Sequence, residues 1–159
     1  MRPFEGIVAE HGAVVLRVCR SMLSASDADD AWSETFIAAL RAYPDLRPDS
    51  NIRGWLVTIA YRKALDQIRA QSRAPQPTAT LPEASSHDDI VSGIDTELRA
   101  ALQALPEKQR GAVIYHYLAE LPYAEVAALL DSSEAAARRS ASDGIANIRK
   151  NYTRGSESR

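Results

Sequence analysis

The feature that most constrains the fold of this chain is a helical repeat of apolar residues on both sides of a central break. Apolar side chains recur at three- and four-residue spacing over residues 4–22, and the same period returns over 28–43, 52–71 and 98–118. This spacing lines one face of an α-helix, whereas a strand would alternate apolar and polar positions. The sequence contains no such alternation, so we predict an all-α fold.

The central break, residues 74–94, has the composition of a linker. It carries three prolines and several Ser and Thr residues, with no sustained apolar period. It also holds Glu83, Asp88 and Asp89 without any Lys or Arg. We therefore expect two small helical domains, residues 1–73 and 95–153, joined by a flexible acidic linker.

The charges are segregated along the chain, although the net charge is only -2. The segment from Asn51 to Arg73 has five basic residues and one acidic residue, and the segment from Arg138 to Arg154 has the same balance. Basic helix faces neutralise nucleic-acid phosphates. The arrangement favours nucleic acid as a partner of both domains, and its alternative is a pair of solvated helix faces.

The second domain contains a helix-turn-helix pattern. A helix opened by Pro122 leads to a turn at Asp131 and Ser132, and the next helix runs from about Glu134 to Lys150 with Ser133 as a good N-cap. In this motif the first residues of the second helix meet base edges in the major groove. The candidates for that contact are Ser133, Glu134, Arg138, Arg139 and Ser142.

The residue inventory argues against an enzyme. His11, His87 and His116 are scattered, Cys19 is the only cysteine, and phosphate loops, nucleophile elbows and zinc motifs are missing from the sequence. We expect no catalytic residue, metal or cofactor. The sequence also has no apolar run of membrane-spanning length and no signal-peptide pattern, which predicts a cytoplasmic protein without membrane insertion.

Four segments resemble the extracytoplasmic-function (ECF) sigma factors, in the order in which that family carries them. The segment from Asp27 to Phe36 and the segment from Trp55 to Asp66 are similar to sigma region 2. Leu105-Pro-Glu-Lys-Gln-Arg110 and Leu121-Pro-Tyr-Ala-Glu-Val-Ala127 are similar to the start and first helix of region 4. The resemblance implies a sigma factor that binds core RNA polymerase and directs promoter recognition and transcription initiation.

The resemblance also implies where the partners bind. Asp30, Glu34 and Arg41 match the surface that grips the clamp helices of the polymerase beta-prime subunit, while region 4 implies contact with the beta flap. The candidates for capturing unstacked minus-10 bases are Tyr43, Asn51, Arg53, Tyr61, Arg62, Lys63 and Arg69. The helix-turn-helix would bind the minus-35 duplex, and an anti-sigma factor is a further expected partner.

Several positions depart from the family pattern. Asp131 replaces the usual turn glycine, Asp143 replaces a basic residue, and Ala and Ser fill much of the segment from Ala135 to Ile145. These changes keep the fold but leave the minus-35 sequence open. Two alternatives therefore stay open: a sigma-like mimic or adaptor that binds an anti-sigma factor, and a helix-turn-helix regulator that acts without polymerase.

Overall fold

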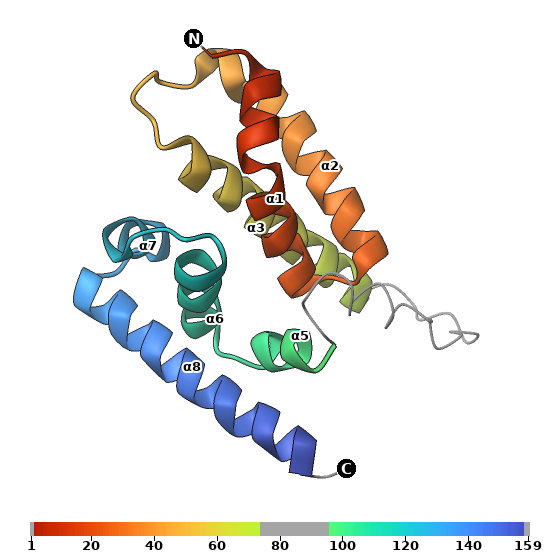
Figure 1. Cartoon of the computed structure of the whole chain (residues 1–159), viewed down its shortest axis with the longest axis vertical. Helices are drawn as coiled ribbons and strands as arrows, with labels where there is room; N and C mark the ends of the chain where they lie inside the picture. The colour runs from red at the N-terminus through yellow and green to blue at the C-terminus, as the bar shows by residue number, and fades with distance from the viewer. Residues whose placement is uncertain (1, 74–95, 158–159) are drawn as a thin grey trace. The chain divides into compact units, whose positions relative to one another are not determined.

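The computed structural model describes residues 2–73 and 96–157 and divides the chain into two compact units, Met1–Thr96 and Glu97–Arg159. Within the described residues all regular structure is helical (Figure 1). The predicted all-α fold is confirmed, and the helices fall into two small units. The predicted linker, residues 74–94, lies outside the described residues.

The first unit is built from three helices that each pack on the other two: α1 (Phe4–Met22), α2 (Ala25–Ala42) and α3 (Ile52–Arg73). Its core is made of the residues that the apolar period predicts. The fully buried ones include Ile7, Val15, Val18, Ala28, Ala31, Ala39, Leu56, Val57 and Ala60. The many alanines on α2 and α3 let the helix axes approach closely, because a small side chain adds little width to the contact.

Two polar contacts fix the helices of this unit. Trp32 Nε1 donates a hydrogen bond of 2.9 Å to the Gly12 carbonyl and so ties α2 to α1. The side-chain oxygen of Asn51 accepts a hydrogen bond of 3.1 Å from the Gly54 amide. This is an N-cap, because it satisfies one of the amides that the first turn of α3 cannot pair.

The second unit contains α5 (Thr96–Gln103), α6 (Glu107–Val113), a π-helical turn η2 (Ile114–Leu118), α7 (Tyr123–Leu130) and α8 (Glu134–Glu157). The structure corrects three expectations. The expected ordinary helix over 112–118 widens into a π turn, in which the Ala119 amide bonds the Ile114 carbonyl at 2.9 Å. The last helix continues past Lys150 to Glu157, and Pro122 precedes α7 as its N-cap.

The turn between α7 and α8 has the expected position and a defined geometry. Asp131 adopts the left-handed conformation, with φ of 53°. The Ser132 amide bonds the Ala127 carbonyl at 2.9 Å, which completes a Schellman C-cap. Ser133 then accepts the Ala136 amide at 3.1 Å as the N-cap of α8, so the predicted cap is confirmed.

Candidate functional site

The outward face of α2 and the adjoining face of α3 enclose a groove of about 530 Å³. It is lined by Asp30, Ser33, Glu34, Lys63, Asp66 and Gln67. Three carboxylates and one ammonium make this groove acidic at neutral pH. Asp30 and Glu34, predicted for polymerase, thus lie together, and Lys63, predicted for DNA, lies beside them.

Two exposed apolar side chains, which the sequence analysis did not single out, extend this face along α2. Ile37 is 50% exposed and Leu40 is 55% exposed, next to the exposed Arg41. They lie outside the buried stripe of α2. Two apolar residues outside that stripe were the only feature of the sequence that could have identified this surface. An exposed apolar pair with charged neighbours is typical of a surface that meets another protein.

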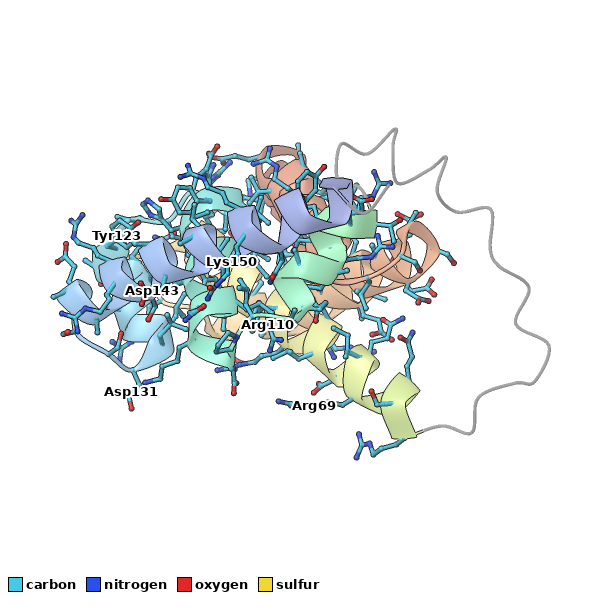
Figure 2. All side chains as sticks on the ribbon, turned by 90° about the horizontal axis from the view of Figure 1, so that it is seen from below. Arg69, Arg110, Tyr123, Asp131, Asp143 and Lys150 are labelled. Atoms are coloured by element: carbon cyan, nitrogen blue, oxygen red, sulfur yellow. The ribbon has the colours of Figure 1, made fainter. Side chains whose placement is uncertain are left out.

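The basic residues predicted on α3 do not all share one face. Arg62 and Arg69 are exposed, and Arg69 points away from the helix in Figure 2. Lys63 turns instead toward the groove, and Arg53 is half-buried at the start of α3. The outward basic face therefore consists of Arg62 and Arg69, and Arg73 follows one turn later.

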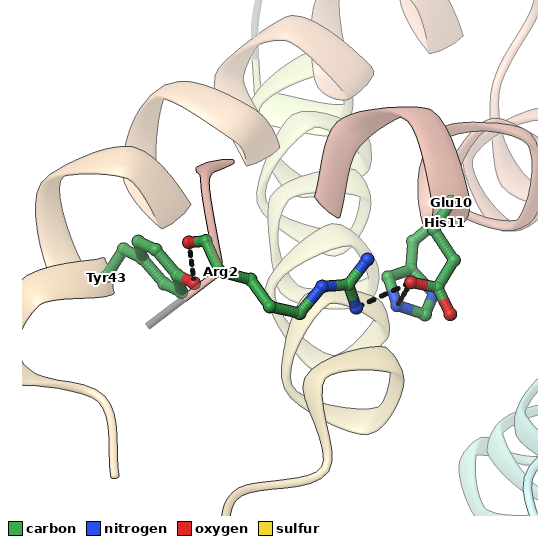
Figure 3. Close-up of polar contacts among 4 residues, drawn as sticks. All are labelled: Arg2, Glu10, His11 and Tyr43. Atoms are coloured by element: carbon green, nitrogen blue, oxygen red, sulfur yellow. Dashed lines mark hydrogen bonds and ion pairs between the residues drawn. The ribbon is translucent and has the colours of Figure 1, made fainter. Parts of the chain in front are cut away.

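The two tyrosines predicted to stack on bases are buried in this structure. Tyr61 is 6% exposed and Tyr43 is 9% exposed. The Tyr43 hydroxyl donates a hydrogen bond of 2.5 Å to the Arg2 carbonyl (Figure 3), and its ring lies 5.5 Å from that of Phe4. Both rings therefore support the bundle that carries the loop between α2 and α3, and neither presents a face to solvent.

A small charged cluster closes the same end of the unit. The Arg2 guanidinium lies 2.6 Å from the Glu10 carboxylate, which lies 3.8 Å from His11 Nε2 (Figure 3). The bond and charge of Arg2 lower the pKa of Glu10. Burial lowers the pKa of His11, whose Nδ1 has no hydrogen-bond partner. The Glu10 carboxylate opposes this lowering, so burial outweighs the favourable charge.

The five residues predicted for the minus-35 duplex are all exposed, and they lie at the start and on the first turns of α8. Figure 2 marks this helix by Asp131 in the preceding turn and by Asp143 and Lys150 along its length. Glu134, Arg138 and Ser142 follow one another at four-residue spacing and so form a line. Asp143 is exposed close to that line and reduces its positive charge.

Arg138 is held by two neighbours. Its guanidinium nitrogen lies 3.0 Å from a Glu134 carboxylate oxygen, and its Cζ lies 4.6 Å from the centre of the Tyr123 ring. The His116 ring stacks on Tyr123 at 3.7 Å with an interplanar angle of 17°. Neither Tyr123 nor His116 was predicted as a site residue, because their contacts depend on how η2, α7 and α8 pack together.

Within residues 2–73 and 96–157, no three His, Cys, Asp or Glu side chains gather closely enough to hold a metal ion. Cys19 is fully buried, and burial raises the pKa of its thiol to about 12. A membrane-spanning helix is likewise not found in the part of the chain that the structure describes.

Comparison with known proteins gives the same division of the chain. Residues 7–74 match the family model of sigma-70 region 2, and residues 95–148 match that of sigma-70 region 4. The sigma factor CarQ of Myxococcus xanthus is 29% identical over 153 residues, covering 92% of this chain and 87% of CarQ. The ECF sigma-E factor of Salmonella typhimurium is 28% identical over 147 residues, covering 82% of this chain and 76% of that protein.

A solved structure extends the similarity to three dimensions. The sigma factor RpoE of Bartonella quintana, crystallised with the anti-sigma factor NepR, superposes with a TM-score of 0.68 at 17% identity. The match covers 94% of this chain and 95% of that one, which supports the fold. Matching regions 2 and 4, relatives along nearly the whole length and the shared fold lead to one conclusion: this chain belongs to the extracytoplasmic-function sigma factors of the sigma-70 family, which direct transcription initiation.

Proposed function

We propose that this sigma factor binds its partners through three surfaces. Residues 1–73 bind core polymerase through the α2 face and the opened minus-10 element through the outward basic face of α3. Residues 95–153 bind the minus-35 duplex through α8, and residues 74–94 join the two through the enzyme. The observation that carries this proposal is that Asp30 and Glu34 line the groove on α2, near the exposed Ile37 and Leu40, whereas Arg62 and Arg69 of α3 are exposed and are not among the residues that line it.

The α2 face suits a protein partner with basic and apolar groups. Asp30 and Glu34 supply negative charge to the groove, and Ile37 and Leu40 supply exposed apolar area beside it. Charge complementarity speeds encounter and selects the partner, whereas burial of apolar area stabilises the complex. We assign this face to the clamp helices of the polymerase beta-prime subunit, and we assign contact with the beta flap to the second unit.

The basic face of α3 suits single-stranded or melting DNA. Arg62 and Arg69 would neutralise phosphates, with Asn51 and Arg53 at the start of α3. We leave the buried Tyr43 and Tyr61 out of the contact surface. Their packing would instead hold the loop in position, since a captured base needs a pocket with fixed walls.

The same α2 face is where an anti-sigma factor would compete with polymerase. The Bartonella relative was crystallised with its anti-sigma factor, and an acidic groove with an apolar rim can serve either partner. Chemistry would remain with polymerase, so we expect no enzymatic activity of this chain. Its place of action is then the cytoplasm, where bacterial polymerase and promoter DNA meet.

In-vitro transcription with core polymerase and a library of genomic fragments tests the proposal. We expect transcripts that start at defined promoters only when the protein is added. A protein that binds an anti-sigma factor but fails to bind core polymerase in a pull-down would be the mimic. A free protein that shifts duplex DNA tightly without polymerase would be the independent regulator, and either outcome would overturn the proposal.

A further inference from the structure

The stack of His116, Tyr123 and Arg138 is the most specific side-chain arrangement on the second unit that the assignment of surfaces leaves unexplained. Arg138 is exposed, with 60% of its side chain accessible, yet it is restrained at two points. One restraint is the Tyr123 ring at 4.6 Å and the other is the Glu134 carboxylate at 3.0 Å. Exposed arginines ordinarily sample many rotamers, so two tethers on one guanidinium limit its freedom.

The ring beneath Arg138 is itself fixed. His116 Nδ1 lies 2.9 Å from the Leu121 carbonyl, and because a carbonyl can only accept, this nitrogen carries a proton and donates it. The His116 ring stacks on Tyr123 and meets Tyr117 edge-on at 4.8 Å. His116 belongs to the π turn η2, so the turn places an aromatic support below the start of α8.

The geometry of the two tethers leaves part of the guanidinium available. Stacking engages the flat face of the group, while hydrogen bonds are made in its plane. Glu134 takes one of the five N–H donors in that plane. The remaining donors can make the paired hydrogen bonds to O6 and N7 by which arginine reads guanine in the major groove.

We propose that Tyr123 is a positioning residue, which holds Arg138 in the orientation that reads a guanine of the minus-35 duplex. The inference rests on the proposed role of α8. An arginine that is ordered before binding loses less conformational freedom when it meets the base. Tyr123 acts through Arg138 and need not touch DNA.

The test is a transcription assay with full-length protein, core polymerase and a promoter library randomised across the minus-35 element. The minus-10 element is taken from a promoter that the wild-type protein opens. We expect Arg138→Ala to abolish a guanine preference at one position. Tyr123→Leu should weaken that preference about two- to fivefold, as expected for loss of an exposed cation–π contact.

The control is Tyr123→Phe, which keeps the ring and should keep the preference. In the Arg138→Ala background, Tyr123→Leu should change nothing further at that position. Thermal unfolding checks that the variants fold, and Tyr123→Met replaces Tyr123→Leu if the leucine variant does not.

Other outcomes distinguish failure of the proposed role of Tyr123 from failure of the proposed function of the protein. If Arg138→Ala abolishes the preference and Tyr123→Leu leaves it intact, Tyr123 does not position Arg138. A uniform loss at all sequences after Tyr123→Leu would show a merely structural role and would also overturn the inference. If Arg138→Ala keeps the preference, Arg138 is not the reader. If wild-type protein starts no transcript, the proposed function fails first and the inference fails with it.

Discussion

Gly144 determines how closely α8 approaches α6. A Cβ atom placed on Gly144 would lie 2.7 Å from Val113 Cγ2 and 3.2 Å from the Gln109 carbonyl oxygen. Real side chains do not approach so closely, and the Gln109 side chain is already engaged by Asn147 at 2.8 Å. The glycine is therefore explained by packing, although glycine is a poor helix former.

We expect Gly144→Ala to lower the free energy of unfolding by about 1–3 kcal/mol, because the added methyl group overpacks the contact. Chemical denaturation followed by circular dichroism measures the change. The control is Gly6→Ala in α1, where the nearest atom to a new Cβ is the end of the flexible Arg2 side chain at 3.8 Å. Equal stability of the two variants would contradict the close contact at α6.

His11 makes the first unit sensitive to acid. Burial lowers the pKa of His11 below its ordinary value of 6.5, and Arg53 and Arg2 add to the lowering while Glu10 opposes it. The unfolded chain therefore binds a proton more readily than the folded chain. The stabilising effect of the neutral ring is complete above about pH 6.5 and is lost as pH falls through the lower folded pKa.

We expect the urea concentration at the midpoint of unfolding to decrease as the pH is lowered from 7 to 5. Ordinary carboxylates stay ionised over this range. His11→Gln has no titrating ring and should flatten this dependence, whatever its effect on stability at pH 7. A variant that keeps the wild-type slope would show that another group carries the dependence.

The role of some residues can be predicted from sequence because it depends on local periodicity, whereas the role of others depends on contacts with distant parts of the chain. Ile7 and Ala28 follow from periodicity alone, because a repeat of 3.6 residues defines a buried face. Tyr43 does not, because an aromatic residue at a helix end can serve a core or a ligand equally well. In the structure its hydroxyl bonds to the carbonyl of Arg2, which lies 41 positions away in the sequence.

Among the elements, the turn from α7 to α8 shows how a family position can change without loss of the fold. Asp131 holds the left-handed conformation that a glycine adopts without strain. The turn was predictable from Asp131, Ser132 and Ser133, since all three types favour turns and caps. The π turn of η2 was not, because a single widened turn leaves the apolar period almost unchanged.

Replacing Asp131 with Gly should raise the free energy of unfolding by about 0.5–1 kcal/mol, because relief of the left-handed strain exceeds the entropy that glycine adds to the unfolded chain. Denaturant unfolding measures the difference. Asp131→Ala is the matched control and should not be stabilised, since alanine retains the strain. A glycine variant no more stable than the alanine variant would contradict the presence of left-handed strain at Asp131.

We expect substitutions on the exposed face of α2 to affect binding of polymerase more than the stability of the fold. We expect the double variant Ile37→Ser and Leu40→Ser to change stability by less than about 0.5 kcal/mol, because both side chains are already exposed. Its affinity for core polymerase should fall about five- to thirtyfold, as for loss of one or two important interface contacts. Fluorescence anisotropy with labelled protein measures the dissociation constant.

The control for this face is Ala13→Gln, at an exposed position of α1 away from the groove. It should bind polymerase with wild-type affinity. Unchanged affinity of the double variant would move the polymerase surface away from the outer part of α2.

For the whole molecule, the distribution of charge matters more than its total. The chain is acidic overall, with a net charge of -2, so it should gain little from non-specific attraction to DNA. The exposed basic groups that we assign to DNA lie on α3 and α8, while others, such as Arg17 and Lys108, lie outside these faces. We therefore expect the chain to depend on polymerase to bring both faces to the promoter, which fits the family to which the chain belongs.

The two basic faces should act at different steps of initiation. Arg138→Ala should weaken initial promoter binding by about 1–3 kcal/mol, because a base contact in duplex DNA forms before melting. The double variant Arg62→Ala and Arg69→Ala should mainly slow conversion to the open complex, because the minus-10 strand becomes available only as the duplex opens. Abortive-initiation kinetics over a series of polymerase concentrations separate the binding constant from the isomerisation rate. Should both variants lower the same parameter alone, the division of labour between α3 and α8 would be wrong, even for a protein that initiates transcription normally.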